Sequence, residues 1–230
     1  MKVEDFRQTL TSMKYNLSDL QSAQLQSYCE LLQEWNSKMN LTAIYETEEV
    51  YEKHFLDCIC ALNEEVQGSV LDVGSGAGFP GLVWKIMHPD LSVTLLEPTQ
   101  KRCRFLSEVI NQLHLEDIEV VNQRAEDFVK EQREAFDIVT ARAVADLAVL
   151  SELCLPLLRV GGIFIAMKGS NAEEEIKRAE SAIKVLGAEM EYIDNRILPF
   201  GERNNIVIRK RKETSKKYPR RYDQIKKRPL

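Results

Sequence analysis

Residues 71–81 read LDVGSGAGFPG and join an apolar, β-rich run to a helical pattern. The acid of this stretch is Asp72, and its glycines are Gly74, Gly76, Gly78 and Gly81. Glycine tolerates positive φ and lets a ligand approach the backbone, while the first turn of the following helix offers unpaired N–H groups. The last three glycines satisfy G-x-G-x-x-G, and Glu97 ends the next β-rich run about 20 residues on, where an acid binds ribose hydroxyls. This stretch predicts a nucleotide-type binding site between a strand and a helix.

The chain after Gly68 alternates short β-rich runs with helical patterns, which is typical of a parallel sheet covered by helices on both faces. Seven strands are predicted, at residues 69–73, 92–96, 118–121, 136–140, 161–166, 188–193 and 204–209. Helices are predicted at residues 80–88, 100–113, 126–132, 145–155 and 171–186. Only a short Pro-Phe-Gly turn separates the last two strands, and a parallel crossover needs about a dozen residues, so this pair should be antiparallel. The predicted fold class is α/β, a doubly wound, seven-stranded Rossmann-like sheet.

The first third of the chain predicts a helical extension. Ser18 and Gln21 have the spacing of a capping box, and an apolar stripe at helical spacing follows: Leu25, Tyr28, Leu32, Trp35 and Met39. Thr47 is expected to cap a second helix with the stripe Tyr51, Phe55, Ile59 and Leu62. We therefore divide the chain into a helical extension (1–67), the α/β domain (68–210) and a basic C-terminal tail (211–230).

Charge is distributed unevenly along the chain. The net charge is -5, yet residues 209–230 hold eleven Lys or Arg and only two acids. Such asymmetry favours contact with a polyanion, most plausibly nucleic acid, although a solvated tail is the simpler interpretation. With 44% hydrophobic and 29% charged residues, the chain should fold into a globule with a buried core.

Several classes of protein are disfavoured by composition. The most apolar stretch, residues 143–158, is interrupted by two acids and a proline, so no membrane span is expected. No export signal is recognisable at the N-terminus, which predicts a cytoplasmic protein. The five cysteines and three histidines have neither disulfide density nor metal-ligand spacing, so no metal site is predicted.

The ligand of the glycine-rich stretch has two candidate identities, because dinucleotide and S-adenosylmethionine sites share this geometry. Asp72 would attract a sulfonium or an ammonium group but repel a pyrophosphate. Ala125, Glu126 and Asp127, after the third strand, provide acceptors for an adenine amino group. The antiparallel last pair of strands is also common in methyltransferases. These features favour the methyl donor, and an NAD-dependent oxidoreductase is the alternative.

Several motifs, in order along nearly the whole chain, carry a resemblance to one family. They are NLTAI (40–44), HFLD (54–57), LDVGSGAGFPG (71–81), KRCRFL (101–106), QRAE (123–126), TARA (140–143), Lys168 with Gly169, and KYPRR (217–221). In these the chain resembles the bacterial small-subunit ribosomal RNA methyltransferase G proteins, also called glucose-inhibited division protein B. The tail departs from the family pattern, because Asp223 and Ile225 stand where relatives often have Gly and Pro.

The resemblance implies a class I methyltransferase fold for residues 68–210 and S-adenosylmethionine as the cofactor. It also implies methylation of N7 of guanine 527, in the decoding-region loop of 16S rRNA. The partner would be 16S rRNA or a precursor of the small subunit, with no membrane contact, and a monomer is expected. Residues that match the donor-site motifs are Gly74, Phe79, Ala125, Glu126 and Arg142. Strand and loop geometry adds Asp72, Gly76 and Glu97 as cofactor-binding candidates.

Guanine N7 has a free lone pair and no proton, so its attack on a methyl carbon needs no general base. The motif typical of exocyclic amine methylation is missing after the fourth predicted strand, and Cys154 lies in an apolar helical run unsuited to a nucleophile. Arg124, Arg142 and Lys168 end strands at the ligand edge, and we expect these catalytic candidates to contact phosphates or stack on the base.

Other polar residues have weaker assignments. Arg196 and Arg203 flank the late turn and are further candidates for RNA contact. His54 and Asp57, three residues apart on one helical face, are expected to fasten the N-terminal helices to the sheet, and Asn40 and His54 to border the substrate cleft. The basic tail keeps open a third alternative, a non-catalytic RNA-binding protein with a vestigial pocket.

Overall fold

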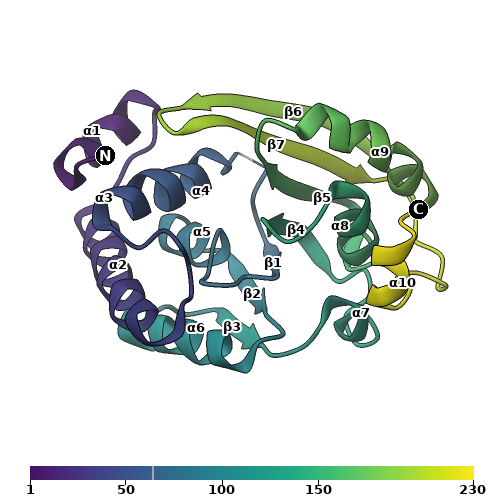
Figure 1. The fold of residues 1–230 in the computed structure, drawn as a ribbon, viewed down its shortest axis with the longest axis horizontal. Coiled ribbons are helices and arrows are strands. Elements are labelled where there is room, and N and C mark those ends of the chain that lie inside the picture. The colour runs from purple at the N-terminus through teal and green to yellow at the C-terminus, as the bar shows by residue number, and fades with distance from the viewer. Residues whose placement is uncertain (64) are drawn as a thin grey trace.

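The computed structural model describes residues 1–63 and 65–230, which form a twisted seven-stranded sheet between two layers of helices (Figure 1). The strands are β1 (Ser69–Val73), β2 (Ser92–Leu96), β3 (Ile118–Val121), β4 (Phe136–Arg142), β5 (Leu158–Lys168), β6 (Ala188–Leu198) and β7 (Gly201–Lys210). Their order across the sheet is β3-β2-β1-β4-β5-β7-β6. The first five are parallel, and β7 runs antiparallel to both β5 and β6. The predicted seven-stranded α/β fold and its antiparallel last pair are confirmed.

Helices cover both faces of the sheet and bury one apolar cluster against each. They are α5 (Gly81–Met87), α6 (Gln100–Gln112), α7 (Ala125–Phe128), α8 (Leu147–Cys154), α9 (Ala172–Val185) and α10 (Tyr222–Lys227). One cluster lies under α5, α6 and the N-terminal helices, and the other under α7, α8 and α9. Apolar residues on both faces explain why the central strands read as continuous hydrophobic runs.

The β6–β7 hairpin is longer than the sequence suggests. Its outer part carries several charged and amide residues, and there Arg196 pairs with Arg203 and Asn195 with Asn204 in the ladder. The strands predicted at 188–193 and 204–209 therefore miss residues 194–198 of β6 and 201–203 of β7. The helix predicted at residues 126–132 is also shorter: it ends at Phe128, and the chain continues in turns in which the N–H groups of Lys130 and Glu131 bond three residues back.

The N-terminal helices pack outside α5 and α6 (Figure 1). They are α1 (Val3–Ser12), α2 (Asp19–Met39), α3 (Thr47–Val50) and α4 (Asp57–Cys60), with a π-helical segment, η1 (Tyr51–Leu56), between the last two. The capping box of Ser18 and Gln21 is present as predicted. The prediction that Thr47 caps the second helix is wrong: α3 begins at Thr47 itself, and the Thr47 hydroxyl accepts a hydrogen bond from Gln33 Nε2 at 3.0 Å.

The C-terminal segment is ordered against the body of the protein. Tyr218 and Ile225 are buried in the cluster beneath α8 and α9. Arg133 donates to the Tyr218 carbonyl at 2.5 Å, and the Thr214 hydroxyl donates to the Leu186 carbonyl at 2.6 Å. The simpler interpretation of a freely solvated tail therefore does not hold for residues 214–225.

Candidate active site

The glycine-rich loop between β1 and α5 is fixed by its own backbone. The N–H groups of Gly74 and Ser75 both bond to the Leu96 carbonyl, at 2.8 and 3.2 Å, which ties the loop to the end of β2. Gly78 has a φ of +97°, and a Cβ there would lie 2.3 Å from Leu82 Cδ1 and 2.7 Å from Tyr28 Oη. Only glycine fits this position, so the loop closes tightly over the start of α5.

Two acidic residues that were predicted to bind the cofactor, Asp72 and Glu97, lie beneath the loop and accept hydrogen bonds from its backbone. Asp72 is fully buried, and its Oδ2 accepts from Gly81 N at 3.0 Å, whereas its Oδ1 has no hydrogen-bond partner among the described residues. Burial raises the pKa of this carboxyl from 3.8 to about 7. Glu97 is also buried and accepts from Gly76 N at 2.9 Å and from Thr99 N at 2.8 Å. Direct contact of Asp72 or Glu97 with S-adenosylmethionine stays a prediction.

Two cavities meet at Gly74. The first, the Tyr222 lobe, has a volume of about 170 Å³ and lies at the carboxyl ends of β1 and β2. Its walls include the apolar residues Val73, Leu96, Pro98 and Leu153, together with Ala125, Glu126 and Tyr222. The second, the His54 lobe, has a volume of about 190 Å³ and is lined by Thr42, His54, Gly76, Phe79 and Arg142. The loop therefore separates an apolar lobe from a polar one.

Arg142 is the most heavily bonded group of the His54 lobe. Its Nε lies 3.1 Å from Asp57 Oδ2, its Nη2 donates to the Lys53 carbonyl at 2.9 Å, and its Nη1 donates to Cys58 Sγ at 3.4 Å. The other oxygen of Asp57, a buried carboxylate, lies 3.2 Å from Arg203 Nε. One carboxylate thus joins two arginines, from β4 and β7, to the N-terminal helices.

His54 faces the same lobe from η1. Its Nδ1 accepts from Arg142 Nη2 at 2.9 Å, which leaves the ring hydrogen on Nε2, 3.2 Å from Thr42 Oγ1. Burial, and then the Arg142 charge, lower the pKa of His54 to about 3, so the ring is neutral at neutral pH. The ring stacks on Phe79, with centroids 4.2 Å apart. His54 and Asp57 fasten the helices to the sheet, as predicted, but they do so through Arg142.

The structure brings most of the predicted site residues to the two lobes. Gly74, Arg124, Ala125 and Glu126 line the Tyr222 lobe, and Gly74, Gly76, Phe79 and Arg142 line the His54 lobe. Lys168 ends β5 beside this region, where its Nζ lies 2.7 Å from Glu175 Oε2 and donates to the Ala145 carbonyl at 2.5 Å.

Sequence reasoning did not single out Thr42 or Tyr222 as residues of the site. The first lies within the NLTAI motif, which was a signal for the region but not for the side chain. Tyr222 was noted only as an aromatic residue of the basic tail expected to contact a polyanion. Nothing in the sequence indicated its contact with the cavity, because that contact depends on how the tail packs on the protein.

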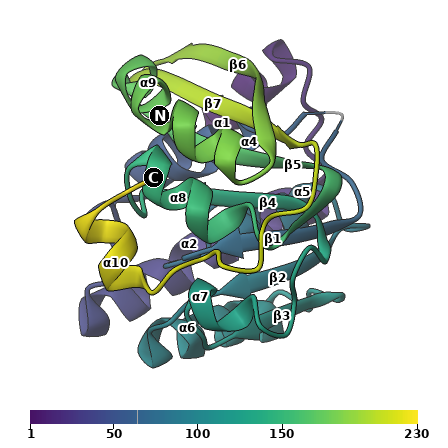
Figure 2. The same ribbon diagram turned by 90° about the vertical axis from the view of Figure 1, so that its right-hand side faces the viewer.

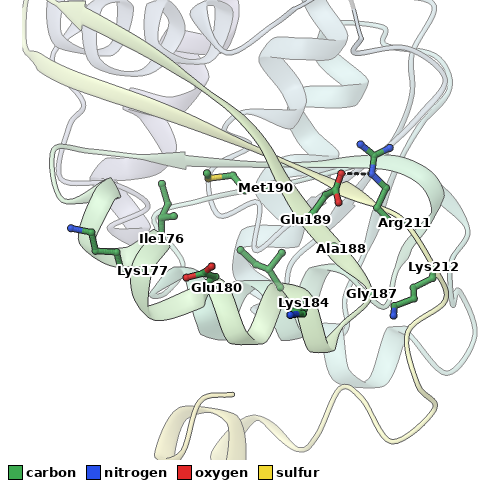
Figure 3. A pocket seen from close by; sticks show the side chains of 11 residues that line it. Ile176, Lys177, Glu180, Lys184, Gly187, Ala188, Glu189, Met190, Arg211 and Lys212 are labelled. Atoms are coloured by element: carbon green, nitrogen blue, oxygen red, sulfur yellow. Dashed lines mark hydrogen bonds and ion pairs between the residues drawn. The ribbon is translucent and has the colours of Figure 1, made fainter.

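A larger cavity, of about 730 Å³, lies elsewhere, between α9 and β6 (Figure 3). Its walls include Met190 and the ion pair of Glu189 with Arg211, at 2.7 Å. In the sheet, Ala188 pairs with Lys210 near the amino end of β5, whereas Lys168 marks the opposite, carboxyl end. Ligands of open α/β sheets bind beyond the carboxyl ends of the strands, so the two lobes at Gly74 are the candidate active site.

Other kinds of site find no support within residues 1–63 and 65–230. These residues contain no group of three or more His, Cys, Asp or Glu side chains arranged to hold a metal ion. None of the helices in this part of the chain is both long and apolar enough to cross a membrane.

The strand order and the antiparallel β7 define the class I, Rossmann-like methyltransferase fold. Solved structures with this fold match the chain. TYW2 of M. jannaschii, in complex with AdoMet, covers 66% of this chain and 72% of its own at 16% identity, with a TM-score of 0.55. The YcgJ protein of Bacillus subtilis covers 69% of this chain and 100% of its own at 14% identity, with a TM-score of 0.53.

The particular family follows from sequence comparison. The family model for rRNA small subunit methyltransferase G matches residues 21–218. Proteins named ribosomal RNA small subunit methyltransferase G from Bacillus cytotoxicus and Bacillus cereus strain ZK are each 49% identical over 228 residues, covering 96% of this chain and 95% of theirs. The chain belongs to the rRNA small subunit methyltransferase G family, and the predicted resemblance is confirmed.

Proposed function

We propose that this protein transfers a methyl group from S-adenosylmethionine to N7 of a guanine in 16S rRNA, guanine 527 by its family resemblance. It would act in the cytoplasm as a monomer, on 16S rRNA or a small-subunit precursor. The observation that carries the proposal is the pair of lobes at Gly74, one apolar and one polar, on a methyltransferase fold.

The residues of the Tyr222 lobe fit the adenosine part of the donor. Val73, Leu96 and Leu153 give a planar base apolar contact. Gln123 Oε1, on the same lobe, is buried without a hydrogen-bond partner among the described residues, and a buried acceptor of this kind is costly unless a donor satisfies it. The adenine amino group is such a donor, and Glu126 offers a second acceptor at this wall.

S-adenosylmethionine supplies an electrophilic methyl carbon on a sulfonium centre. The residues of the chain then need only to align this methyl carbon with guanine N7, because N7 has no proton to remove. Alignment of this kind contributes up to about 7–11 kcal/mol in the most favourable oriented systems. Neutral His54 fits this requirement, because it can donate a hydrogen bond through Nε2 without acting as a base.

Positive charge at the His54 lobe is partly compensated by a carboxylate of the chain itself. The guanidinium of Arg142 is paired with buried Asp57, which also faces Arg203. The carboxylate therefore offsets part of the repulsion that the two arginines would exert on a guanine that becomes cationic at N7.

The test is transfer of a labelled methyl group from S-adenosylmethionine to small-subunit RNA. In Gly74→Asp the new side chain would collide with Val144, since even a Cβ there lies 2.8 Å from Val144 Cγ2. We expect this variant to transfer no detectable label. Equal transfer by wild type and Gly74→Asp would reject the site.

Gly161→Asp is the matched control. Gly161 also has positive φ, +89°, but a Cβ there would meet nothing within 4 Å, and the residue lies at the amino end of β5. The control therefore carries the same added charge and a similar backbone strain, and it should retain transfer. RNA binding by wild-type protein without donor binding or transfer would instead favour the non-catalytic alternative.

A further inference from the structure

The C-terminal helix α10 reaches back to the candidate donor site. The tail crosses the molecule and ends in α10, which packs against α8 (Figure 2). The first residue of this helix, Tyr222, forms part of the wall of the Tyr222 lobe together with Gly74 and Glu126. Its ring also faces Arg124, whose guanidinium carbon lies 5.9 Å from the ring centroid. Tyr222, from the C-terminal tail, thus completes a cavity at the carboxyl ends of β1 and β2.

A buried ion pair holds the start of α10 in place. Glu152 of α8 is fully buried, and its two oxygens accept three hydrogen bonds from Arg220, from the backbone N at 2.9 Å, Nε at 2.8 Å and Nη2 at 2.6 Å. A buried carboxylate without its partner is strongly unfavourable, so this contact resists opening. Arg220 precedes Tyr222 by two residues, and Ile225 on the next turn is fully buried. The position of Tyr222 is therefore fixed from both sides.

The chemistry of the lobe indicates what Tyr222 would contact. Besides the tyrosine ring, the walls combine aliphatic and proline side chains with the charged Arg124 and Glu126. Gln123 Oε1 is an acceptor without a partner among the described residues. A flat, partly apolar group with a hydrogen-bond donor at its edge satisfies both features, and the adenine of the methyl donor has this form. Aromatic rings bind bases through their faces.

We propose that Tyr222 is a donor-binding residue, which contacts the adenosine part of the methyl donor, and that the Arg220–Glu152 ion pair positions it. This inference rests on the proposed function, because the occupant of the lobe is taken to be S-adenosylmethionine. It assigns to the basic tail a role in binding the small molecule, separate from any contact with RNA.

The first experiment measures binding of S-adenosylhomocysteine to the full-length protein by isothermal titration calorimetry. Tyr222→Ala should raise the Kd about tenfold or more, since loss of stacking on a base has about this effect. Tyr222→Phe keeps the ring and should bind within about twofold of wild type. Unchanged binding by Tyr222→Ala would overturn the inference.

The second experiment compares two neighbouring arginines. Arg220→Ala removes the ion pair with Glu152 and should weaken S-adenosylhomocysteine binding. The matched control is Arg221→Ala, whose side chain is 85% exposed and whose ion-pair partner, Asp223, is exposed as well. It should bind like wild type. Equal binding by the two variants would overturn the positioning role.

A kinetic readout separates positioning from a general loss of structure. In Arg220→Ala and Tyr222→Ala the KM for S-adenosylmethionine should rise, while kcat at saturating donor stays near that of wild type. A fall in kcat with unchanged KM would contradict the inference. Failure of wild-type protein to bind S-adenosylhomocysteine would overturn the proposed function and the inference together. If wild-type protein binds S-adenosylhomocysteine and Tyr222→Ala binds it equally well, only the inference is overturned.

Discussion

At the scale of single residues, Asp72 leads to a prediction on pH dependence. Its pKa is raised from 3.8 to about 7, so between these values the folded protein binds a proton that the unfolded chain has released. The contribution of Asp72 to the free energy of unfolding therefore falls as pH rises through this window, by about 1.4 kcal/mol for each pH unit between the two pKa values. Asp72→Asn cannot ionise and keeps an oxygen for Gly81 N. Between pH 4 and pH 8 the urea midpoint of this variant should therefore fall less than the midpoint of wild type, and an equal fall in the two proteins would contradict this account of Asp72.

Motifs identified the site residues that they contain, but not the side chains that other parts of the fold bring to the site. Gly74, Ala125 and Glu126 were predicted as site residues and line one lobe. Thr42 and Tyr222 were not, because their place at the site depends on how the N-terminal helices and the tail pack on the sheet. The spacing of residues along one strand or one loop contains no information about such packing.

At the scale of helices and strands, regular spacing of apolar and capping residues predicted the elements correctly. Elements that depart from regular spacing or regular backbone geometry were not predicted. The capping box and the central strands of the sheet followed from spacing alone. The π-helical segment η1 was not predicted, because its apolar residues keep helical spacing while the backbone takes a wider turn. The outer part of the β6–β7 hairpin was missed because charged and amide side chains interrupt its apolar pattern, although Leu198 beside the turn is buried.

The capping box predicts a measurable loss of stability. Ser18 Oγ accepts from Gln21 N at 3.2 Å, and Gln21 Oε1 accepts from Ser18 N at 2.9 Å. Ser18→Ala should lower the free energy of unfolding by about 1 kcal/mol, as determined from urea denaturation. Ser12→Ala is a suitable control, because this exposed hydroxyl bonds only within the last turn of α1. An equal effect of the two substitutions would contradict the role of the cap.

At the scale of the whole molecule, the C-terminal tail combines exposed basic charge with buried residues that hold it against the protein. It was predicted as a basic segment for nucleic acid, and the structure shows that part of it is also packed into the protein. Buried anchors such as Tyr218 and Ile225 alternate with exposed basic residues such as Lys226 and Lys227. Composition gave the charge correctly, but it did not reveal the anchors, because these are isolated residues in a strongly polar stretch.

The exposed charges of α10 predict a salt-dependent contribution to RNA binding. Each lysine that neutralises a phosphate adds about 0.7–0.9 to the slope of log affinity against log salt. Replacing Lys226 and Lys227 by alanine should lower this slope by up to about 2 for a fragment of small-subunit RNA. The double replacement of Lys177 and Lys184, which line the distant cavity of Figure 3, should leave the slope unchanged. Equal slopes for the two double variants would contradict an RNA contact at α10.

The central claim is that the lobes at Gly74 hold a methyl donor against the free lone pair of a guanine. Nucleotide-resolution mapping of N7-methylguanosine in 16S rRNA, from cells with and without this protein, tests it most directly. We expect the modification at guanine 527 in cells that contain the protein and its loss in cells that lack it. An identical N7-methylguanosine pattern in the two kinds of cell would contradict the account.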